Sequence, residues 1–267
     1  MERGRFYIAV DCEGAACAVG SPLAGLGRGE NYAFAAKQAA REANAAARAL
    51  FDMGAQDVLI WDNHGDGVNL DYDLLDERCR IVNGSGFAHR FPRIDESFGG
   101  VLFIGYHARA GEKGAVLAHT YASAAYQRVE IDGQAVGEME IDAAFAGKKG
   151  VPVIFAASDD IAAAQAKQAF PWAETVWTKE ALSYNGAISL HPQEACRRIE
   201  AGVRRAAARL PEMRPYVIKE PFCLTVRYLR PEAAGEARLY DRDGRPFSAP
   251  DAHTRKGVVA QIEDLRL

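Results

Sequence analysis

The chain has 267 residues, of which 49% are hydrophobic and 25% are charged, which is the composition of an ordinary globular enzyme or binding protein with a full core. Its formal net charge of −4, without a basic run, gives no electrostatic footprint for nucleic acid or for an anionic membrane. No apolar segment approaches the ~20 residues of a membrane span.

The cysteines and the first residues indicate the compartment. Five cysteines are present, none of them in a CxxC pair, which argues against both a disulfide framework and a structural zinc knuckle. The opening MERGRFYIAV lacks the apolar region of a signal peptide. We therefore expect a cytoplasmic protein.

The first apolar strand runs into two acids. The stretch YIAVDCEGAA carries Asp11 and Glu13 with Cys12 between them. In an extended chain, residues two apart project to one side, and two carboxylates that close repel each other unless a proton or a cation lies between them. Cys12 would then point to the opposite face, as a buried structural cysteine rather than a metal ligand or nucleophile. The alternative is that the strand has already ended, with both acids solvated or with Asp11 capping the next segment.

Strand and helix signals alternate along most of the chain. Residues 31–54 are Ala-rich and end in Gly, which predicts a long helix, and DVLIWD at 57–62 predicts the next strand. Strand, helix and strand form a βαβ unit, which implies a parallel sheet. The later segments continue the pattern with a strand in 99–111, a hairpin in 129–137, a helix in 138–150, a strand in 151–160, and helices in 160–170 and 191–210.

The character of the sequence changes beyond about residue 215, where strand-like pieces such as PFCLTVRYL have few helix signals between them. We predict an α/β protein with a mostly parallel sheet flanked by helices and a smaller C-terminal α+β lobe. In this division the main domain comprises residues 1–214 and the lobe comprises residues 215–267.

Acids and histidines follow several of the predicted strands. They are Asp11 and Glu13, then Asp62, His64 and Asp66, then His107, with His119 after another short apolar run and Glu138 at the start of a helix. A single histidine in such a place is more often a hydrogen-bonded structural residue. In an open parallel sheet, however, ligands bind beyond the carboxyl ends of the strands, and three strands here deliver carboxylate or imidazole groups to one edge. That ligand set suits zinc or a related divalent ion, and a shared cation would explain why two acids lie together.

Six short motifs in order resemble the DppA-like D-aminopeptidase family of zinc peptidases. They are VDCEG, EAN within the predicted long helix, IWDNHGDGVNL, LFIGYHARAG, AVLAHTY and IDGQAVGE, and the match runs from about residue 5 to about residue 200. The resemblance implies a catalytic domain with two zinc ions per subunit. It makes Asp11 the bridging ligand, Glu13 and His107 the other ligands of one ion, His64 and Glu138 those of the second, and His119 the catalytic residue.

The resemblance also implies an activity and an assembly. The family releases N-terminal D-amino acids from short peptides through metal-activated water, and its members form ring-shaped homo-oligomers described as decamers. We expect the same of this chain, with a short peptide or an amino-acid amide as substrate and with no nucleic-acid or membrane partner.

Departures from the family pattern leave two other functions open. Cys12 stands where the family has Met, the loop after VDCEG differs, and ALSYNGAISLHP lacks the family's arginine, all of which bear on substrate choice and chirality. One alternative is a binuclear metal hydrolase of another amide, a lactam or a phosphoester. The other is a non-catalytic, ring-forming protein with structural zinc. Five ligands shared by two ions leave coordination positions open, which favours catalysis.

Some polar residues near the motifs have a structural alternative. Asp66 either binds the α-amine of a substrate or is a turn residue, and we favour the turn. Tyr106 and Arg109 flank a proposed ligand and either touch substrate or serve packing and a solvated charge. We expect three other histidines to be surface or capping residues: His89, His191 and His253.

Overall fold

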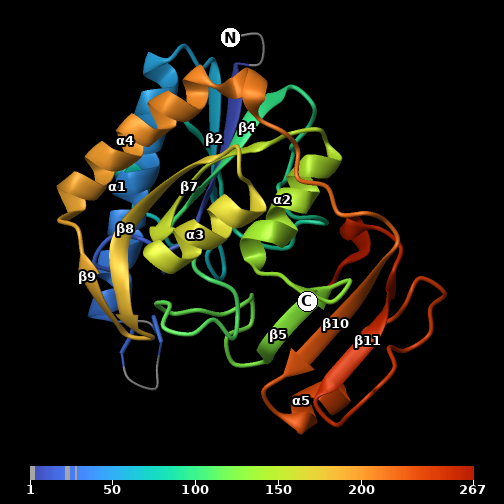
Figure 1. The fold of residues 1–267 in the computed structure, drawn as a ribbon. Coiled ribbons are helices and arrows are strands. Elements are labelled where there is room, and N and C mark those ends of the chain that lie inside the picture. The colour runs from blue at the N-terminus through green and yellow to red at the C-terminus, as the bar shows by residue number, and fades with distance from the viewer. Residues whose placement is uncertain (1–3, 22–24, 28) are drawn as a thin grey trace.

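The structure is a computed structural model that describes residues 4–21, 25–27 and 29–267. In this part of the chain the larger sheet has seven strands in the order β3-β2-β1-β4-β7-β8-β9, parallel except for β9, which runs antiparallel to β8 (Figure 1). The strands are β1 Arg5–Val10, β2 Asp57–Asp62, β3 Arg80–Val82, β4 Phe98–Ile104, β7 Val153–Asp159, β8 Glu174–Ser183 and β9 Gly186–Ser189.

A second, antiparallel sheet has the order β11-β10-β5-β6. Its strands are β5 Tyr126–Ile131, β6 Gln134–Ala135, β10 Phe222–Tyr228 and β11 Thr254–Val259. Buried and half-buried residues alternate along β10, because one face of this sheet packs against the main body. The predicted hairpin in 129–137 therefore pairs with strands of the C-terminal lobe, and the boundary at residue 214 stays a prediction.

Five α-helices lie in the described residues: α1 Glu30–Asp52, α2 Glu138–Lys148, α3 Asp160–Ala169, α4 Pro192–Ala208 and α5 Pro231–Glu236. Short 3-10 turns lie at Tyr72–Leu74, Leu210–Glu212 and Ile262–Asp264. None of the helices in the described residues is long and apolar enough to cross a membrane.

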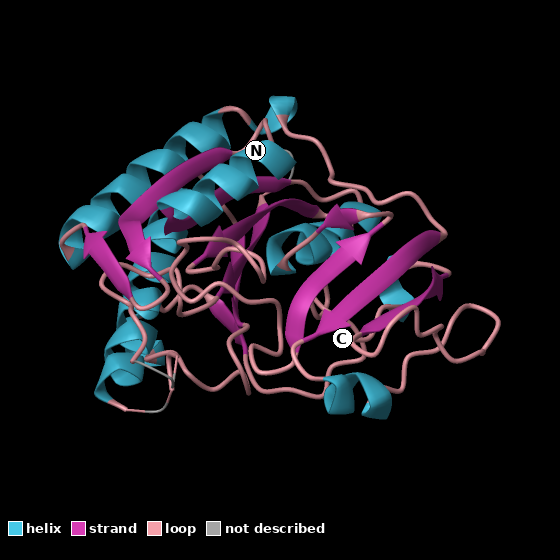
Figure 2. Cartoon of the chain, turned by 60° about the horizontal axis from the view of Figure 1, so that its bottom comes forward, coloured by secondary structure: helices cyan, strands magenta, loops and turns pink. Residues whose placement is uncertain are grey.

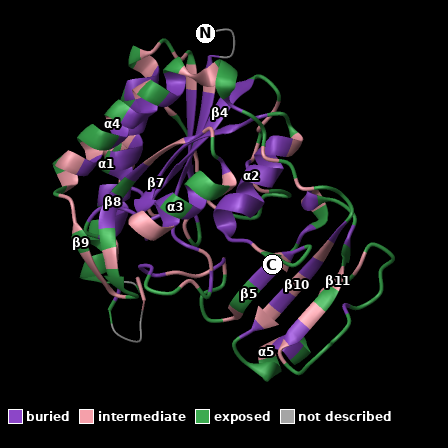
Figure 3. Ribbon diagram, viewed as in Figure 1, coloured by how far each residue is buried: buried purple, intermediate pink, exposed green. Residues whose placement is uncertain are grey.

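The core lies on both faces of the larger sheet. Along β1, Phe6 and Ile8 point to one face and pack with α1 and α4, whereas Tyr7 and Ala9 point to the other and pack with α2, α3 and the smaller sheet. This alternation is the period of two expected of a central strand with both faces covered. Figure 3 shows the result, with buried strands in purple between the helices and with β5, β10 and β11 on the side away from α1 and α4. Figure 2 shows the strands of both sheets in magenta and the helices in cyan.

The predicted fold class is confirmed, and so are the long helix, the parallel strands and the hairpin. Three strands were not anticipated, namely β3, β8 and β9. The first strand ends at Val10, so Asp11 and Glu13 lie in the turn after it and not on a strand face. The acids are nevertheless only 4% and 5% exposed, so they are not solvated.

Candidate metal centre

The segments that follow three adjacent strands, β2, β1 and β4, carry the predicted ligands to one edge of the sheet. Asp11 is the first residue after β1, His64 comes two residues after β2, and His107 comes three residues after β4. Glu138 is the first residue of α2, and His119 lies in the loop between β4 and β5. A cavity of about 450 Å³ opens here and is lined by Asp11, Glu13, His64, His119 and Glu138.

Asp11 lies between two imidazoles. Its Oδ1 is 2.8 Å from His64 Nδ1, and its Oδ2 is 3.4 Å from His107 Nε2. His64 Nδ1 is also 3.1 Å from Glu13 Oε2, and His107 Nε2 is 3.2 Å from Glu138 Oε1. One carboxylate thus presents its two oxygens to two separate groups of ligands, which is the arrangement of a bridging ligand.

His119 joins the site beside His107. The two rings are stacked with centroids 3.8 Å apart and planes 12° apart, and His119 Nε2 is 3.9 Å from Glu138 Oε1. The sequence analysis singled out this residue after a short apolar run, and the resemblance supplied its catalytic role; it lies with the five proposed ligands.

The backbone sets the tautomers of two of these histidines. His107 Nδ1 lies 3.0 Å from the carbonyl oxygen of Ala108, and His119 Nδ1 lies 2.8 Å from that of Leu117. A carbonyl oxygen only accepts hydrogen bonds, so Nδ1 carries the proton in both neutral rings and the lone pair lies on Nε2. A backbone carbonyl bonded to the far nitrogen is the usual way in which a metal-binding histidine is oriented.

The lone pairs meet carboxylates rather than donors. Among the described residues, His107 Nε2 and Glu13 Oε2 are buried atoms without a hydrogen-bond partner. Acceptors that face one another at 3.2–3.4 Å repel each other unless a cation or a proton lies between them. The donor set of imidazole and carboxylate therefore fits a divalent ion such as zinc.

The carboxylates of the site raise the pKa values of two of its histidines. Burial by itself lowers the pKa of His64, but the hydrogen bond to Asp11 and the charges of Glu13 and Asp11 outweigh it and raise the pKa to about 11. Burial also lowers the pKa of His107, and the charge of Glu138 raises it to about 10. Burial raises the pKa of Glu138, but the charge of His107 leaves it below its usual value. The carboxylates of the site therefore favour positive charge at the positions that the imidazoles face.

A buried lysine that the sequence analysis did not single out supports the loop after β1. Lys179 in β8 is fully buried, and its ammonium donates to the carbonyl oxygens of Ala15 at 2.8 Å, Ala18 at 2.6 Å and Glu13. Burial lowers its pKa to about 8, against the charges of Asp159, Glu42 and Glu13. The signal in the sequence that could have identified Lys179 is its place directly after the apolar and β-branched run TVWT.

Glu42 of α1, within the EAN motif, holds the same loop from the other side. Its Oε1 accepts from the backbone N–H of Ala16 at 2.9 Å and from Gln38 Nε2 at 3.0 Å. The EAN motif therefore contributes a loop anchor rather than a metal ligand.

The remaining candidates lie away from the ligands or serve the framework. Cys12 is buried in the core, as expected. Asp62 accepts from the backbone N–H groups of Asn69 and Leu70 and shapes the loop that carries His64. Asp66 is exposed and does not line the cavity. Arg109 pairs with Glu140 and Glu112.

The three other histidines are structural or exposed. His191 accepts from Gln193 N and caps α4, His89 is exposed, and His253 Nδ1 lies 3.2 Å from the carbonyl oxygen of Tyr228. The capping or surface roles expected for His191 and His89 are confirmed.

Comparison with known proteins identifies the family. A family model described as D-aminopeptidase matches residues 5–245. The chain belongs to the D-aminopeptidase family. It is 30% identical over 194 residues to the D-aminopeptidase of Bacillus subtilis (strain 168), which covers 72% of this chain and 70% of that protein. Membership confirms the family and the enzyme class, a peptide-bond hydrolase, that the six motifs indicated.

A solved member of the D-aminopeptidase family has the same fold. It is the Zn-dependent D-aminopeptidase DppA from Bacillus subtilis, described as a self-compartmentalizing protease. The TM-score is 0.87 at 24% sequence identity, over 97% of this chain and 93% of that one. The likeness extends through both sheets, which confirms the fold over nearly the whole chain.

Proposed function

We propose that the protein is a zinc aminopeptidase that releases N-terminal D-amino acids from short peptides, with two zinc ions per subunit. The observation that carries the proposal is the pair of oxygens of Asp11, each facing an imidazole of a different ligand group. Family membership supports the reaction, and the names of the Bacillus subtilis relatives support zinc and the D configuration.

The ligand assignment follows the sequence motifs. In it Asp11 would bridge the ions, Glu13 and His107 would hold one, and His64 and Glu138 would hold the other. The shortest contacts support a second partition, in which Glu13 shares an ion with His64 and Glu138 shares one with His107. Both partitions keep Asp11 as the bridge and leave positions free for substrate and water.

The bound ions would supply a Lewis acid and a water that ionises near neutral pH. The chain's own contribution to the chemistry is His119. With Nδ1 bonded to the carbonyl oxygen of Leu117, its Nε2 is the atom that accepts a proton and returns it to the leaving amine. This Nε2 lies 3.9 Å from Glu138 Oε1, beside the proposed metal ligands.

A phosphoesterase is disfavoured by the charges around the cavity. Among the described residues that line it, Arg90 is the only lysine or arginine, and its guanidinium is already bound to Asp142. A phosphoesterase is expected to place more lysine or arginine side chains near its metal ions, to stabilise the charge on the phosphoryl oxygens.

The β8–β9 hairpin supports the proposed assembly into a ring-type homo-oligomer, a decamer. It exposes Leu182 at 65%, Ile188 at 58% and Tyr184 at 44%, and Tyr184 also lines the metal cavity. A subunit contact on this hairpin would remove apolar surface from water and enclose the cavity mouth. The five unpaired cysteines support a location in the reducing cytoplasm.

Amine release from matched D- and L-aminoacyl dipeptides and amides tests the proposed reaction. We expect metal-free protein to be inactive and added zinc to restore release from the D-aminoacyl dipeptides. Release from L-residues or amides alone would retain the metal site and change the substrate. No release from any of them, with zinc bound, would favour a non-peptide hydrolase or a scaffold.

A further inference from the structure

An ion pair between Arg90, which lines the metal cavity, and the buried Asp142 lies at its wall. Arg90 Nε and Nη2 each donate to one oxygen of Asp142, both at 2.7 Å, and Asp142 is fully buried. The guanidinium also lies over the rings of Trp61 and Tyr121, at 4.8 and 4.9 Å from their centroids. Two parallel bonds and two ring contacts fix the guanidinium in one position.

Three further side chains join this pair. Tyr106 Oη donates to Asp142 Oδ2 at 2.6 Å, and Tyr121 Oη donates to Oδ1 at 3.2 Å. Asn63 donates to Tyr106 Oη at 2.8 Å and accepts from Arg90 Nη2 at 2.8 Å. We call these five residues, Asn63, Arg90, Tyr106, Tyr121 and Asp142, the Asp142 cluster.

Four members of the Asp142 cluster are close neighbours of proposed site residues along the chain. Asn63 precedes His64, Tyr106 precedes His107, Tyr121 follows His119 by two positions, and Asp142 follows Glu138 by four positions, one turn of α2. The cluster thus connects the loop after β2, the loop after β4, the loop of His119 and α2. Because of these connections, a displacement of Asp142 would also displace the segments that carry His64, His107, His119 and Glu138.

The backbone of Tyr121 is held in an uncommon conformation. Its φ is 53°, in the left-handed region that bulky residues seldom adopt, and its backbone N–H donates to Glu138 Oε1 at 2.6 Å. Its hydroxyl bond to Asp142 and this backbone bond connect the same residue to the cluster and to a proposed ligand. Hydrogen bonds therefore hold both the backbone and the side-chain hydroxyl of Tyr121.

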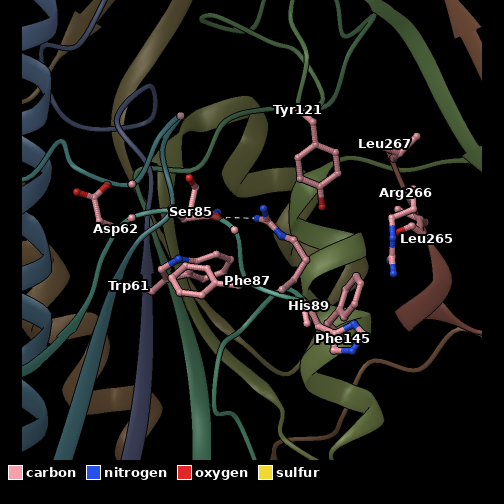
Figure 4. A pocket seen from close by; sticks show the side chains of 17 residues that line it. Trp61, Asp62, Ser85, Phe87, His89, Tyr121, Phe145, Leu265, Arg266 and Leu267 are labelled. Atoms are coloured by element: carbon pink, nitrogen blue, oxygen red, sulfur yellow. Dashed lines mark hydrogen bonds between the residues drawn. The ribbon is translucent and has the colours of Figure 1, made fainter. Parts of the chain in front are cut away.

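The cluster forms a wall between two cavities. Asn63, Arg90 and Tyr121 line both the metal cavity and a second cavity of about 350 Å³. Figure 4 shows this second cavity, with Trp61 and Phe87 on one side, Phe145 and the last residues of the chain on another, and the hydroxyl of Tyr121 pointing inward. The three side chains that face the cavities, those of Asn63, Arg90 and Tyr121, are held to the two fully buried members of the cluster by hydrogen bonds.

We propose that the Asp142 cluster is a positioning network for zinc binding, in which Asp142 and Arg90 set the geometry of the segments that carry His64, His107, His119 and Glu138. The inference rests on the proposed zinc function. Metal sites demand ligands placed within a fraction of an ångström, and groups that orient ligands typically change metal affinity by about 10- to 100-fold when removed.

Zinc affinity of the metal-free protein, measured by competition with a chelator, is the test. Asp142→Asn keeps the shape but removes the charge that holds Arg90, and Tyr106→Phe removes one hydroxyl without changing any charge. Tyr126→Phe is the matched control, because Tyr126 lies in β5 of the smaller sheet and its ring packs on Tyr228, which is not a member of the cluster. The unfolding temperature of each metal-free variant is measured in parallel.

We expect zinc affinity to fall at least about tenfold in Asp142→Asn and severalfold in Tyr106→Phe, with the control within twofold of wild type. Metal-free Tyr106→Phe should unfold within a few degrees of the control, which separates positioning from stability. If Asp142→Asn does not fold, Tyr106→Phe decides. If Tyr106→Phe, and Asp142→Asn where it folds, bind zinc as tightly as the wild type, the positioning role is wrong but the proposed function stands. If the wild type itself does not bind zinc, both the positioning role and the proposed function are wrong.

Discussion

Buried charged side chains define the candidate site at the scale of single residues. Lys179 has no buried carboxylate within salt-bridge distance among the described residues and is bound by three carbonyl oxygens of one loop. Glu42 binds a backbone N–H of the same loop. These two buried side chains, one donating to the loop and one accepting from it, hold the turn that presents Asp11 and Glu13.

Lys179→Met should loosen this turn, since methionine fills the same space without donating. Each buried carbonyl left without a donor costs about 1–3 kcal/mol, so we expect the free energy of unfolding to fall by at least about 2 kcal/mol. Urea unfolding of the metal-free protein measures this, with exposed Lys113→Met as control. A loss below about 0.5 kcal/mol, no more than a surface substitution causes, would contradict the role given to Lys179.

Glu42→Gln should change how stability depends on pH. Burial raises the pKa of Glu42 to about 7. Between its unfolded value of 4.5 and about 7 the folded state keeps a proton that the unfolded state has lost, so stability from this group falls as pH rises through that window. The variant lacks the titration but keeps an oxygen for Ala16. Wild-type stability should therefore fall relative to Glu42→Gln over that range, and parallel curves would contradict the raised pKa.

His119→Ala should separate catalysis from metal binding. We expect kcat to fall by about 10²–10⁴-fold, the usual contribution of an acid–base group, with two zinc ions retained. Elemental analysis beside the kinetics checks this. Loss of zinc from the variant would make His119 a ligand instead.

At the scale of elements, the sequence predicts those helices and strands that have a clear local pattern of composition or hydrophobicity. Helix α1 and strands β2, β4 and β7 have clear composition or apolar runs, and strand ends and family motifs predict the six proposed site residues. Strand β8 was missed because its inward and outward residues include Thr, Lys and Glu, which break the apolar pattern. The pairing of β5 with β10 joins segments about 100 residues apart, and no local signal encodes that contact.

The turn after β1 also depends on contact between elements that the sequence does not reveal. A Cβ at Gly14 would lie 2.0 Å from the carbonyl oxygen of Tyr106, because the β1 and β4 loops touch there. The site therefore requires a glycine where VDCEG ends.

Gly14→Ala should force the two loops apart. We expect a loss of about 1–3 kcal/mol in the free energy of unfolding, together with weaker zinc binding. Gly235→Ala, where an added Cβ meets nothing within 4 Å, is the control and should be neutral or slightly stabilising. Unchanged unfolding of Gly14→Ala would show that the loops are not in close contact.

At the scale of the whole molecule, the larger sheet presents the site at one edge and the β8–β9 hairpin lies beside its cavity. Tyr184, in the turn of that hairpin, belongs both to the cavity wall and to the exposed apolar surface. The assembly was predicted from the family resemblance, because no local pattern distinguishes an exposed subunit contact from ordinary surface.

Leu182→Glu combined with Ile188→Glu should disrupt the proposed assembly, since both side chains are exposed and apolar in the isolated chain. We expect light scattering to report smaller particles than the wild type, with zinc binding retained. Val217→Glu, at an equally exposed apolar residue outside the hairpin, is the control. An unchanged mass in the double variant would place the subunit contact elsewhere.

The most direct test of the account is a zinc titration of metal-free protein, followed both by calorimetry and by cleavage of a D-aminoacyl dipeptide. We predict that binding saturates at two ions per chain and that cleavage appears as the sites fill. Full cleavage by metal-free protein, or saturation at a single ion with full activity, would contradict a centre in which Asp11 bridges two metals.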